Sequence, residues 1–330
     1  MLTEIPKRIL IIRLSSLGDV LLATPLIRSI KTQHPETQID FLVREEYKSI
    51  LQFNPNINIL YALSRSEKMK FLTEILKKNN YDFVIDLQNN FRSRLIRNAL
   101  GKKIFSFKKP VIEKYLLVRF KINLFKKLKT ITELYAESVP QYKLDGKGLE
   151  LFIPENVQTQ LNADGNYIGL TPGSKHFTKR WLEEYFIELG NELVKNNFTP
   201  VIFGGRDDKE ICERIVRGID GSINLCNNND LYQTSADMKI CKVIVCNDSG
   251  LMHTAAASGV QVIAIFGSSV KEFGFTPYGV RNLILENNSL SCRPCSHIGR
   301  SSCPKKHFKC MKELTPQIVL DNTLKFLSEL

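Results

Sequence analysis

Residues 242–267 read KVIVCNDSGLMHTAAASGVQVIAIFG, two apolar runs with a polar break between them. The runs at 242–246 and 260–267 are continuous enough to be strands that are buried on both faces. The residues between them, after Asp248 and Ser249, are compatible with a helix. A buried strand, a helix and a second buried strand form a βαβ unit, which is built on a parallel sheet. This stretch therefore predicts an α/β fold, with an acid, a hydroxyl and a glycine at the end of a strand.

The same alternation runs through the whole chain. Runs rich in Ile, Val and Phe are separated by ten or more helix-compatible residues, at 8–13, 38–43, 56–63, 81–87, 167–172, 199–205, 242–246 and 260–267. Between the two sets of four, residues 142–166 contain Gly, Pro and several Asn and Gln, which is typical of a linker. Since a single core stops growing near about 250–300 residues, 330 residues predict two domains. We place them at 1–160 and from 161 onward, each with its own parallel sheet.

Composition excludes several classes of protein. The chain is 43% hydrophobic and 24% charged, which is ordinary for a globular protein. No window approaches the roughly 18 uninterrupted apolar residues of a membrane span. The start, MLTEIPKRIL, runs directly into a strand-like segment and does not resemble a signal peptide. We expect a cytoplasmic protein.

Most of the excess positive charge lies in one segment. The formal net charge is +12, and residues 101–129 hold ten Lys or Arg against one acid, Glu113, a local net of +9. In residues 111–130 the lysines alternate with apolar residues, which favours an interfacial helix on an anionic membrane surface. A solvated helix packed on the sheet is the alternative. Nucleic acid is excluded as a partner because no recognition motif accompanies the charge.

Two loops of the first domain carry polar groups after strands. In the first, Ser15 and Ser16 can bond exposed amides, Gly18 allows a tight turn, and Asp19 enters the first turn of the next helix. Asp19 is either a functional acid or only a helix cap. In the second loop, three arginines from Arg92 onward offer donors for phosphate or carboxylate, or form a solvated basic face. Neither loop contains a dinucleotide fingerprint or a P-loop lysine.

Two loops of the second domain suit a nucleotide diphosphate. Gly173, Ser174 and Lys179 combine amides, a hydroxyl and an ammonium at the start of a helix, which is the chemistry of a diphosphate site. Asp208, after Gly204 and Gly205, is placed to bind ribose hydroxyls, or is an ordinary acid at a helix start. Trp181 is expected in the core.

Five motifs, taken together in their order along the chain, resemble those of a known family. RLSSLGDVLLATPLIRSIK, DLQNNFRSRL, TPGSKHFTKRWLEEYFIEL, FGGRDDKE and VCNDSGLMHTAAASGVQVIAIFGSS are similar, in order and spacing, to glycosyltransferase family 9, the lipopolysaccharide heptosyltransferases. The resemblance covers roughly residues 7–330. It implies a GT-B fold, two Rossmann-like domains with parallel sheets facing a central cleft. Residues 1–160 would bind the acceptor and 161–314 the nucleotide-sugar donor, and a last helix at 315–330 would pack back on the first domain.

The resemblance also implies the reaction. Family members transfer heptose from ADP-heptose to the lipopolysaccharide inner core, with inversion at the anomeric carbon and no catalytic metal. The partners would be an ADP-sugar, a lipid A–core oligosaccharide and, through residues 101–129, the inner face of the inner membrane. A family member that uses another nucleotide sugar, or a catalytically silent binding protein of the same fold, are the alternatives.

Site residues follow by position in the motifs. Asp19 matches the general base. The donor site would comprise Thr171, Gly173, Ser174, Lys179, Asp208, Asp248, Ser249, Gly250 and His253. The acceptor site would include Ser16, Gly18, Gln88, Arg92 and Ser93. Asp248 raises a question, because its charge would repel a phosphate; we expect it to point to sugar hydroxyls while the next amides face the diphosphate. If it is instead buried against backbone amides and points away from the cleft, its role is to brace the loop and the sugar contact is withdrawn.

The eight cysteines all follow residue 211, and four of them form a C-x2-C-x7-C-x6-C pattern. Four thiolates can close a structural zinc site, and a cytoplasmic location disfavours disulfides. Cys292, Cys295, Cys303 and Cys310 therefore hold a structural zinc ion or are free thiols. A cofactor for catalysis is not expected.

Overall fold

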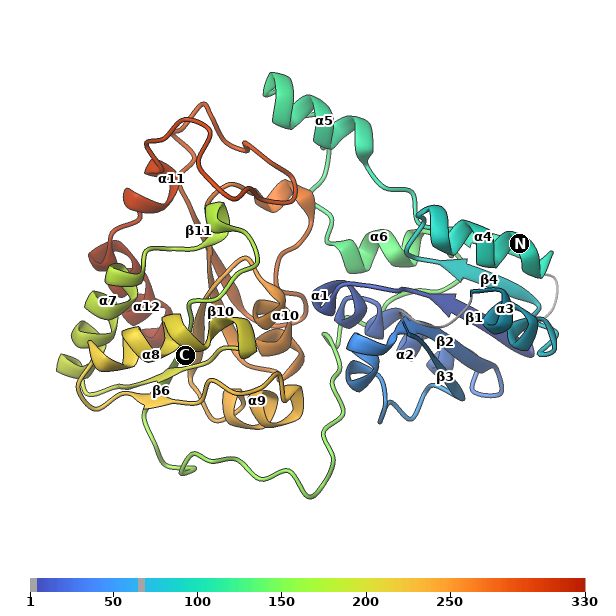
Figure 1. The fold of residues 1–330 in the computed structure, drawn as a ribbon, viewed down its shortest axis with the longest axis horizontal. Helices are drawn as coiled ribbons and strands as arrows, with labels where there is room; N and C mark the ends of the chain where they lie inside the picture. The colour runs from blue at the N-terminus through green and yellow to red at the C-terminus, as the bar shows by residue number, and fades with distance from the viewer. Residues whose placement is uncertain (1–4, 65–68, 330) are drawn as a thin grey trace. The chain divides into compact units, whose positions relative to one another are not determined.

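The computed structural model describes residues 5–64 and 69–329 and divides into two compact units (Figure 1). Unit 1 comprises the chain up to Lys109 together with Lys129–Phe152. Unit 2 comprises Pro110–Leu128 and the chain from Ile153 onward. Each unit is built around one parallel sheet, so the predicted α/β class with two parallel-sheet domains is confirmed.

Unit 1 contains a five-stranded sheet in the order β3-β2-β1-β4-β5. The strands are β1 Arg8–Ile12, β2 Gln38–Arg44, β3 Ile59–Leu63, β4 Phe83–Asp86 and β5 Lys103–Ser106. The helices are α1 Leu17–Leu21, α2 Thr24–Gln33, α3 Met69–Lys77, α4 Phe91–Leu100 and α6 Ile131–Glu137, with a 3-10 turn at Glu45–Ile50. The strand order reverses between β1 and β4. We call the carboxyl ends of these two strands the first switch point, the place where open α/β sheets bind ligands.

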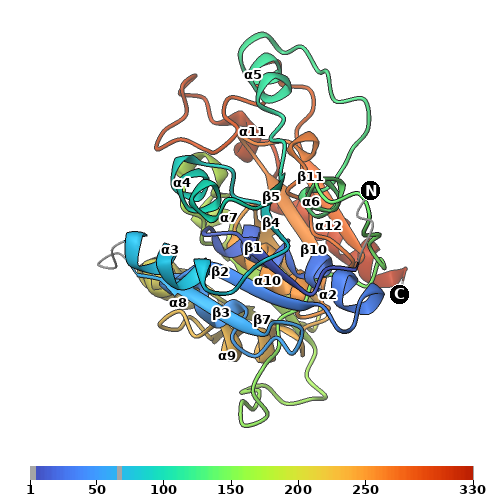
Figure 2. The same ribbon diagram turned by 90° about the vertical axis from the view of Figure 1, so that its right-hand side faces the viewer.

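Helices cover both faces of this sheet. Leu10 and Ile12 of β1 pack with Leu72, Leu76 and Ile96 of α3 and α4, and α2 lies on the opposite side (Figure 2). Because every residue from Ile9 to Ile12 is fully buried, the continuous apolar run of β1 is the direct consequence of a two-sided burial.

Unit 2 contains a six-stranded parallel sheet in the order β11-β10-β9-β6-β7-β8. The strands are β6 Tyr167–Thr171, β7 Thr199–Ile202, β8 Ile223–Asn224, β9 Val243–Asn247, β10 Gln261–Phe266 and β11 Asn282–Glu286. The helices are α5 Val111–Phe120, α7 Glu183–Lys195, α8 Lys209–Arg217, α9 Leu231–Met238, α10 Gly250–Ala257, α11 Lys309–Lys312 and α12 Pro316–Ser328. Short 3-10 turns lie at Phe177–Lys179, Arg206–Asp208 and Lys271–Phe273. The order reverses between β9 and β6, which we call the second switch point.

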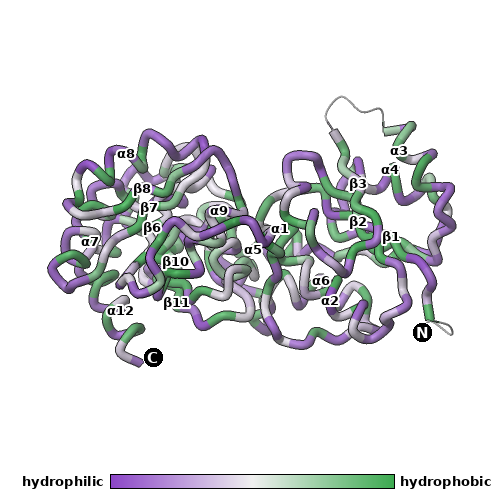
Figure 3. The backbone as a smooth tube through the Cα atoms, turned by 90° about the horizontal axis from the view of Figure 1, so that it is seen from below, coloured by the Kyte–Doolittle hydropathy of each residue, from purple (hydrophilic) through white to green (hydrophobic). Residues whose placement is uncertain are grey.

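Two apolar clusters lie on the faces of the second sheet, and in Figure 3 the strands carry long hydrophobic stretches. Residues of α7, α8, α11 and α12 pack on one face, and residues of α9 and α10 pack on the other. Trp181 belongs to the first cluster, as expected, with 1% of its surface exposed. Its indole Nε1 donates to the carbonyl of Leu314 at 2.8 Å, which satisfies the one polar atom of the ring.

The eight predicted strands are all present, and the described residues form three further strands that were not predicted. β5 begins with Lys103 in the basic segment, β8 has only two residues, and β11 begins at Asn282 with the half-buried pattern of an edge strand. Each of them lies at or next to the edge of its sheet, where less burial is required and the apolar signal is weak.

The division into units differs from the expected domain composition for one segment. The segment 110–128, expected in the first domain, belongs to unit 2, because Leu117 packs against Val270 and Phe273. The predicted helix over 111–130 ends at Phe120, since Lys121 adopts a left-handed φ of 63°. The last helix is α12, which places Val319, Leu320 and Phe326 in the core of unit 2 beside α7, and its expected packing back on the first domain stays a prediction.

The linker divides between Phe152 and Ile153 rather than at 160. On the unit 1 side, Asp145 accepts two hydrogen bonds of 2.7 Å from Arg28. On the unit 2 side, Asp237 accepts hydrogen bonds from Thr159 and Gln160. Polar side chains thus attach each end of the linker to its own unit. Across the described part of the chain, every helix is too short or too polar to span a bilayer.

Candidate functional site

Asp19 lies at the first switch point, in the first turn of α1. Its Oδ2 accepts hydrogen bonds from the amide and the hydroxyl of Ser16, at 3.1 and 2.9 Å. Its Oδ1 is 2.5 Å from Nη2 of Arg13, and the hydroxyl of Tyr135 donates to the same oxygen at 3.5 Å. One oxygen therefore braces the helix start, as in the capping interpretation, while the other holds a cation.

Arg13 and Tyr135 were missed by the sequence analysis. The guanidinium of Arg13 is buried at the end of β1 and also donates to the carbonyl of Leu87 at 2.7 Å. The signal available was the arginine that closes the otherwise apolar run RILIIR. Tyr135 comes from α6, more than a hundred residues away, and left no signal near the motif.

This environment keeps Asp19 ionised. Burial opposes ionisation, but the charge of Arg13 and the hydrogen bonds from Ser16 outweigh it and hold the pKa of Asp19 below its ordinary value of 3.8. The Asp19 side chain is still 17% exposed. A carboxylate that is charged, oriented and partly accessible can accept a proton from a hydroxyl group.

Gln88 joins the two loops of the first switch point. Its Oε1 accepts from the amides of Leu14 at 2.9 Å and Ser15 at 3.1 Å. Ser93 is buried and donates to Asp86 at 2.9 Å, so it belongs to the framework. Of the predicted acceptor residues, the structure brings Ser16, Gly18 and Gln88 to the Asp19 loop, with Ser16 exposed. Arg92 is exposed on α4, and its contact with an acceptor stays a prediction.

At the second switch point the loops after β6 and β9 meet at Asp248. The ammonium of Lys179 lies 2.6 Å from Oδ2 of Asp248, and the hydroxyl of Ser269 donates to the same oxygen. Ser174 donates to the carbonyl of Asp248 at 3.2 Å. The side chains of Lys179 and Asp248 are 14% and 8% exposed. The structure therefore brings together residues that the sequence predicted in one donor site.

In the described structure the Asp248 carboxylate is buried against an ammonium and a hydroxyl rather than against backbone amides. These two contacts brace the loop. The expected contacts of Asp248 with a sugar and of Lys179 with a diphosphate stay predictions. Asn247, which was missed, supports the same loop: its side chain accepts from the Trp181 amide at 2.9 Å and donates to the Pro172 carbonyl at 2.8 Å.

The start of α10 offers donors beside this pair. Ser249 is the residue before the helix, and its hydroxyl is buried with no hydrogen-bond partner among the described residues. Gly250 opens the helix, and His253 is buried one turn further. Because the first amides of a helix have no intrahelical partner and carry the positive end of the dipole, they can bind an anion.

Asp208 lies against Gly173, the second residue of the loop that follows β6. A Cβ added to Gly173 would collide with the Asp208 carboxylate, so only glycine allows this approach. The carboxylate also accepts from the Gly205 amide at 3.1 Å. Burial raises the pKa of Asp208, although that hydrogen bond and Arg180 oppose the shift. Thr171 is the buried last residue of β6, directly before this loop.

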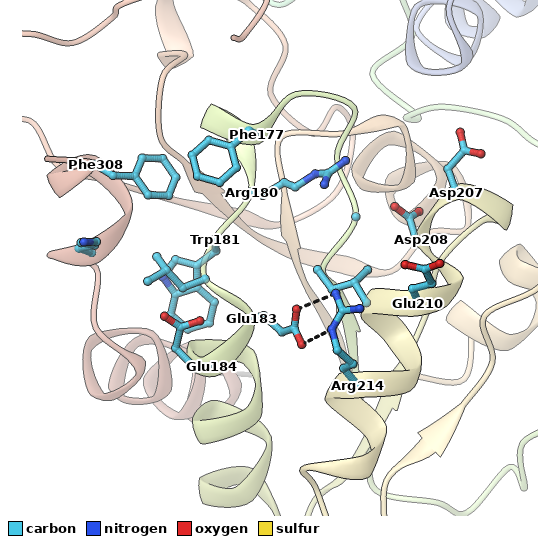
Figure 4. A pocket seen from close by; sticks show the side chains of 14 residues that line it. Phe177, Arg180, Trp181, Glu183, Glu184, Asp207, Asp208, Glu210, Arg214 and Phe308 are labelled. Atoms are coloured by element: carbon cyan, nitrogen blue, oxygen red, sulfur yellow. Dashed lines mark hydrogen bonds and ion pairs between the residues drawn. The ribbon is translucent and has the colours of Figure 1, made fainter. Parts of the chain in front are cut away.

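Gly173 and Asp208 line a cavity of about 480 Å³ (Figure 4). Phe177 stacks on Phe308 at one side, with ring centroids 4.9 Å apart. Charged side chains from the starts of α7 and α8 surround the remainder, and Arg214 pairs with Glu183 at 2.8 Å. The cavity has the volume of a small-ligand site and contacts two of the predicted donor residues.

The cysteine cluster does not form the four-thiolate site. No group of three or more His, Cys, Asp or Glu side chains within residues 5–64 and 69–329 is placed to hold a metal ion. All eight cysteines are free thiols, and Cys292 lies 3.8 Å from Nε2 of His307. Burial raises the pKa of Cys310 to about 12. In this arrangement the four thiols are not gathered around one point, and the structural zinc ion stays a prediction.

Comparison with known proteins identifies the family of the chain. The model of glycosyltransferase family 9 (heptosyltransferase) matches residues 69–306. Lipooligosaccharide heptosyltransferase 2 of Campylobacter jejuni is 28% identical over 324 residues, which cover 94% of this chain and 95% of that protein. These matches confirm the resemblance found in the sequence.

Solved structures share the fold. A family 9 glycosyltransferase of Veillonella parvula superimposes with a TM-score of 0.79 at 23% identity, covering 98% of both chains. ADP-heptose lps heptosyltransferase II of E. coli has a TM-score of 0.74 at 22% identity, covering 98% of this chain and 99% of that one. The expected GT-B fold class is thereby confirmed.

Proposed function

The chain belongs to glycosyltransferase family 9 and is a glycosyltransferase, and from that premise we propose that it transfers a heptose from ADP-heptose to the lipopolysaccharide inner core. The transfer would invert the anomeric carbon, require no catalytic metal ion and take place at the cytoplasmic face of the inner membrane. The names of its relatives support the sugar and the acceptor. The observation that carries the proposal is Asp19, a charged and partly exposed carboxylate at the first switch point.

Asp19 would act as the general base. Its carboxylate takes the proton of an acceptor hydroxyl while that oxygen forms a bond to the anomeric carbon and the bond from that carbon to the ADP oxygen breaks. Attack from the face opposite the leaving ADP inverts the configuration. Arg13 and Tyr135 hold the base in position, and a positioned base contributes about 10²–10⁴ in rate.

Unit 2 would stabilise the leaving ADP without a metal ion. The ammonium of Lys179 has three donors and uses one on Asp248, so two can reach diphosphate oxygens. The Ser249 hydroxyl and the amides at the start of α10 add further donors. Fixed donors and a helix dipole stabilise the developing negative charge, as an oxyanion hole does. Asp208 would accept from the ribose hydroxyls.

The test is a donor and product assay with the purified protein. ADP-heptose, ADP-glucose and UDP-sugars are each incubated with heptose-deficient core oligosaccharide, with and without EDTA. Of the three donors, we expect only ADP-heptose to release its nucleotide in the presence of the acceptor, and EDTA should not change the rate. The anomeric configuration of the product, measured by NMR, should be opposite to that of the donor. Turnover with UDP-sugars would contradict the donor, a retained configuration would contradict the mechanism, and inhibition by EDTA would contradict metal independence.

A further inference from the structure

The segment Pro110–Leu128 is unusually apolar for a surface element. Its helix α5 reads VIEKYLLVRF, with apolar residues on all sides. A helix of this kind is ordinarily buried in a core or in a membrane. In this structure only Leu117 of the helix is buried. The segment therefore has one covered side and a larger uncovered one.

The covered side is attached to unit 2. Leu117 packs with Val270 and Phe273, and the ring of Phe125 lies 6.4 Å from that of Phe273. Lys121 closes the helix and donates to the carbonyl of Pro294 at 2.7 Å. The segment is thus positioned on unit 2 rather than extended freely into solvent.

The uncovered side carries a row of large apolar side chains, which we call the apolar row. Its members and their exposed fractions are Val111 65%, Ile112 69%, Tyr115 60%, Phe120 56%, Ile122 49%, Leu124 48% and Leu128 61%. Scattered exposed apolar residues are normal, but seven large ones within the nineteen residues of Pro110–Leu128 mark an interaction surface. Covering it would remove apolar area from water and so favour association.

Charge identifies what covers the apolar row. Within the segment five basic residues oppose Glu113 alone, and Arg119, Lys126 and Lys127 are exposed beside the row. A second copy of the chain would bring two such basic surfaces together, which is unfavourable. An anionic bilayer accepts both features, since apolar and aromatic side chains enter the interface and lysines meet the headgroups.

We propose that Pro110–Leu128 is a membrane-docking surface that seats unit 2 on an anionic lipid bilayer. The apolar row enters the interfacial layer, and Arg119, Lys126 and Lys127 contact lipid phosphates. The inference rests on the proposed function for its purpose, since a lipid-anchored acceptor is confined to a membrane. Its test does not use catalysis.

The experiment is flotation of the full chain with phosphatidylcholine vesicles, with and without phosphatidylglycerol. We expect binding to the anionic vesicles that falls as sodium chloride is added. The variant I112S/Y115S/L128S should bind at least roughly tenfold more weakly. K126Q/K127Q should bind about thirtyfold more weakly, since each basic residue near an anionic surface contributes about 1 kcal/mol. The control F71S removes an equally exposed aromatic residue of α3 in unit 1 and should bind as the unaltered protein does.

The outcomes are separable from the proposed function. All three variants should transfer sugar to a delipidated core oligosaccharide at the unaltered rate, whatever their vesicle binding. Equal binding of the apolar-row variant and F71S, or binding that ignores lipid charge and salt, would overturn the docking surface. Self-association that the apolar-row variant abolishes, in a protein that does not float with vesicles, would assign the row to a second copy.

Discussion

The two switch points carry the same pair of groups in different surroundings. At the first, Asp19 pairs with Arg13, and the acid is the more exposed partner, at 17% against 7%. At the second, Asp248 pairs with Lys179, and the acid is the less exposed partner, at 8% against 14%. The more exposed group is the carboxylate in the first pair and the ammonium in the second. Two ion pairs of the same type at strand ends can therefore differ in function, because the more exposed partner is the group that a ligand can contact.

The largest expected effect separates the two acids by turnover. Asp19→Asn keeps the shape of the side chain and removes the base, so kcat should fall by about 10²–10⁴ while ADP binding is retained. Steady-state kinetics and calorimetry with ADP measure the two quantities. The control Asp145→Asn disrupts another Arg–Asp pair of unit 1, with Arg28, and should leave kcat nearly unchanged. Normal turnover of Asp19→Asn would exclude it as the base.

The second pair should matter most for stability. Lys179→Met or Asp248→Asn leaves the other partner buried without its counter-charge or hydrogen bond, which costs about 3–5 kcal/mol for buried pairs. The free energy of unfolding in urea measures the loss. The double variant should recover part of it, because neither charge then remains. Strictly additive losses would show that the two groups are not coupled.

Substitution of Arg13 tests whether its charge keeps Asp19 ionised. The pKa of Asp19 is lowered in the folded state, so its ionisation stabilises the fold above the unfolded pKa, and this contribution disappears as pH falls through the folded pKa. In Arg13→Met burial persists without its compensating charge, and the pKa of Asp19 should rise. We expect the acidic limb of the kcat/KM profile to move to higher pH by about one unit or more. Arg28→Met, which breaks the other pair, should leave the limb in place.

The smallest expected effect distinguishes two neighbouring acids in the loop after β7. Asp208→Asn should weaken ADP binding by about five- to tenfold, the value of one ordinary hydrogen bond of about 1 kcal/mol, because asparagine keeps one acceptor oxygen. Asp207→Asn, one residue earlier and exposed, is the matched control and should bind ADP normally. Calorimetric titration with ADP measures both. Equal affinities of the two variants would remove Asp208 from the ribose site.

Much of the fold could be predicted because long-range burial leaves a local pattern. A strand buried on both faces, such as β1 or β9, must be apolar at every position, and the pattern is visible in the sequence. β8 and β5 left little signal, since short or outer strands need less apolar area. The sequence also could not predict that α12 packs in the core of unit 2. An amphipathic pattern shows that a helix has an apolar face, but not which surface covers that face.

The site divides in the same way. The residue types and their order in the sequence were enough to predict the loops at both switch points and the acids, hydroxyls and glycines on them. This works because the loops that follow parallel strands lie at one edge of the sheet. The residues that contact these acids could be found only from the three-dimensional structure. Tyr135 reaches Asp19 from α6, and Ser269 reaches Asp248 from the end of β10, so neither contact has a local pattern. The sequence by itself determines which chemical groups are present and which loops they occupy. Their charge state and accessibility depend on neighbours that only folding brings within a few ångströms.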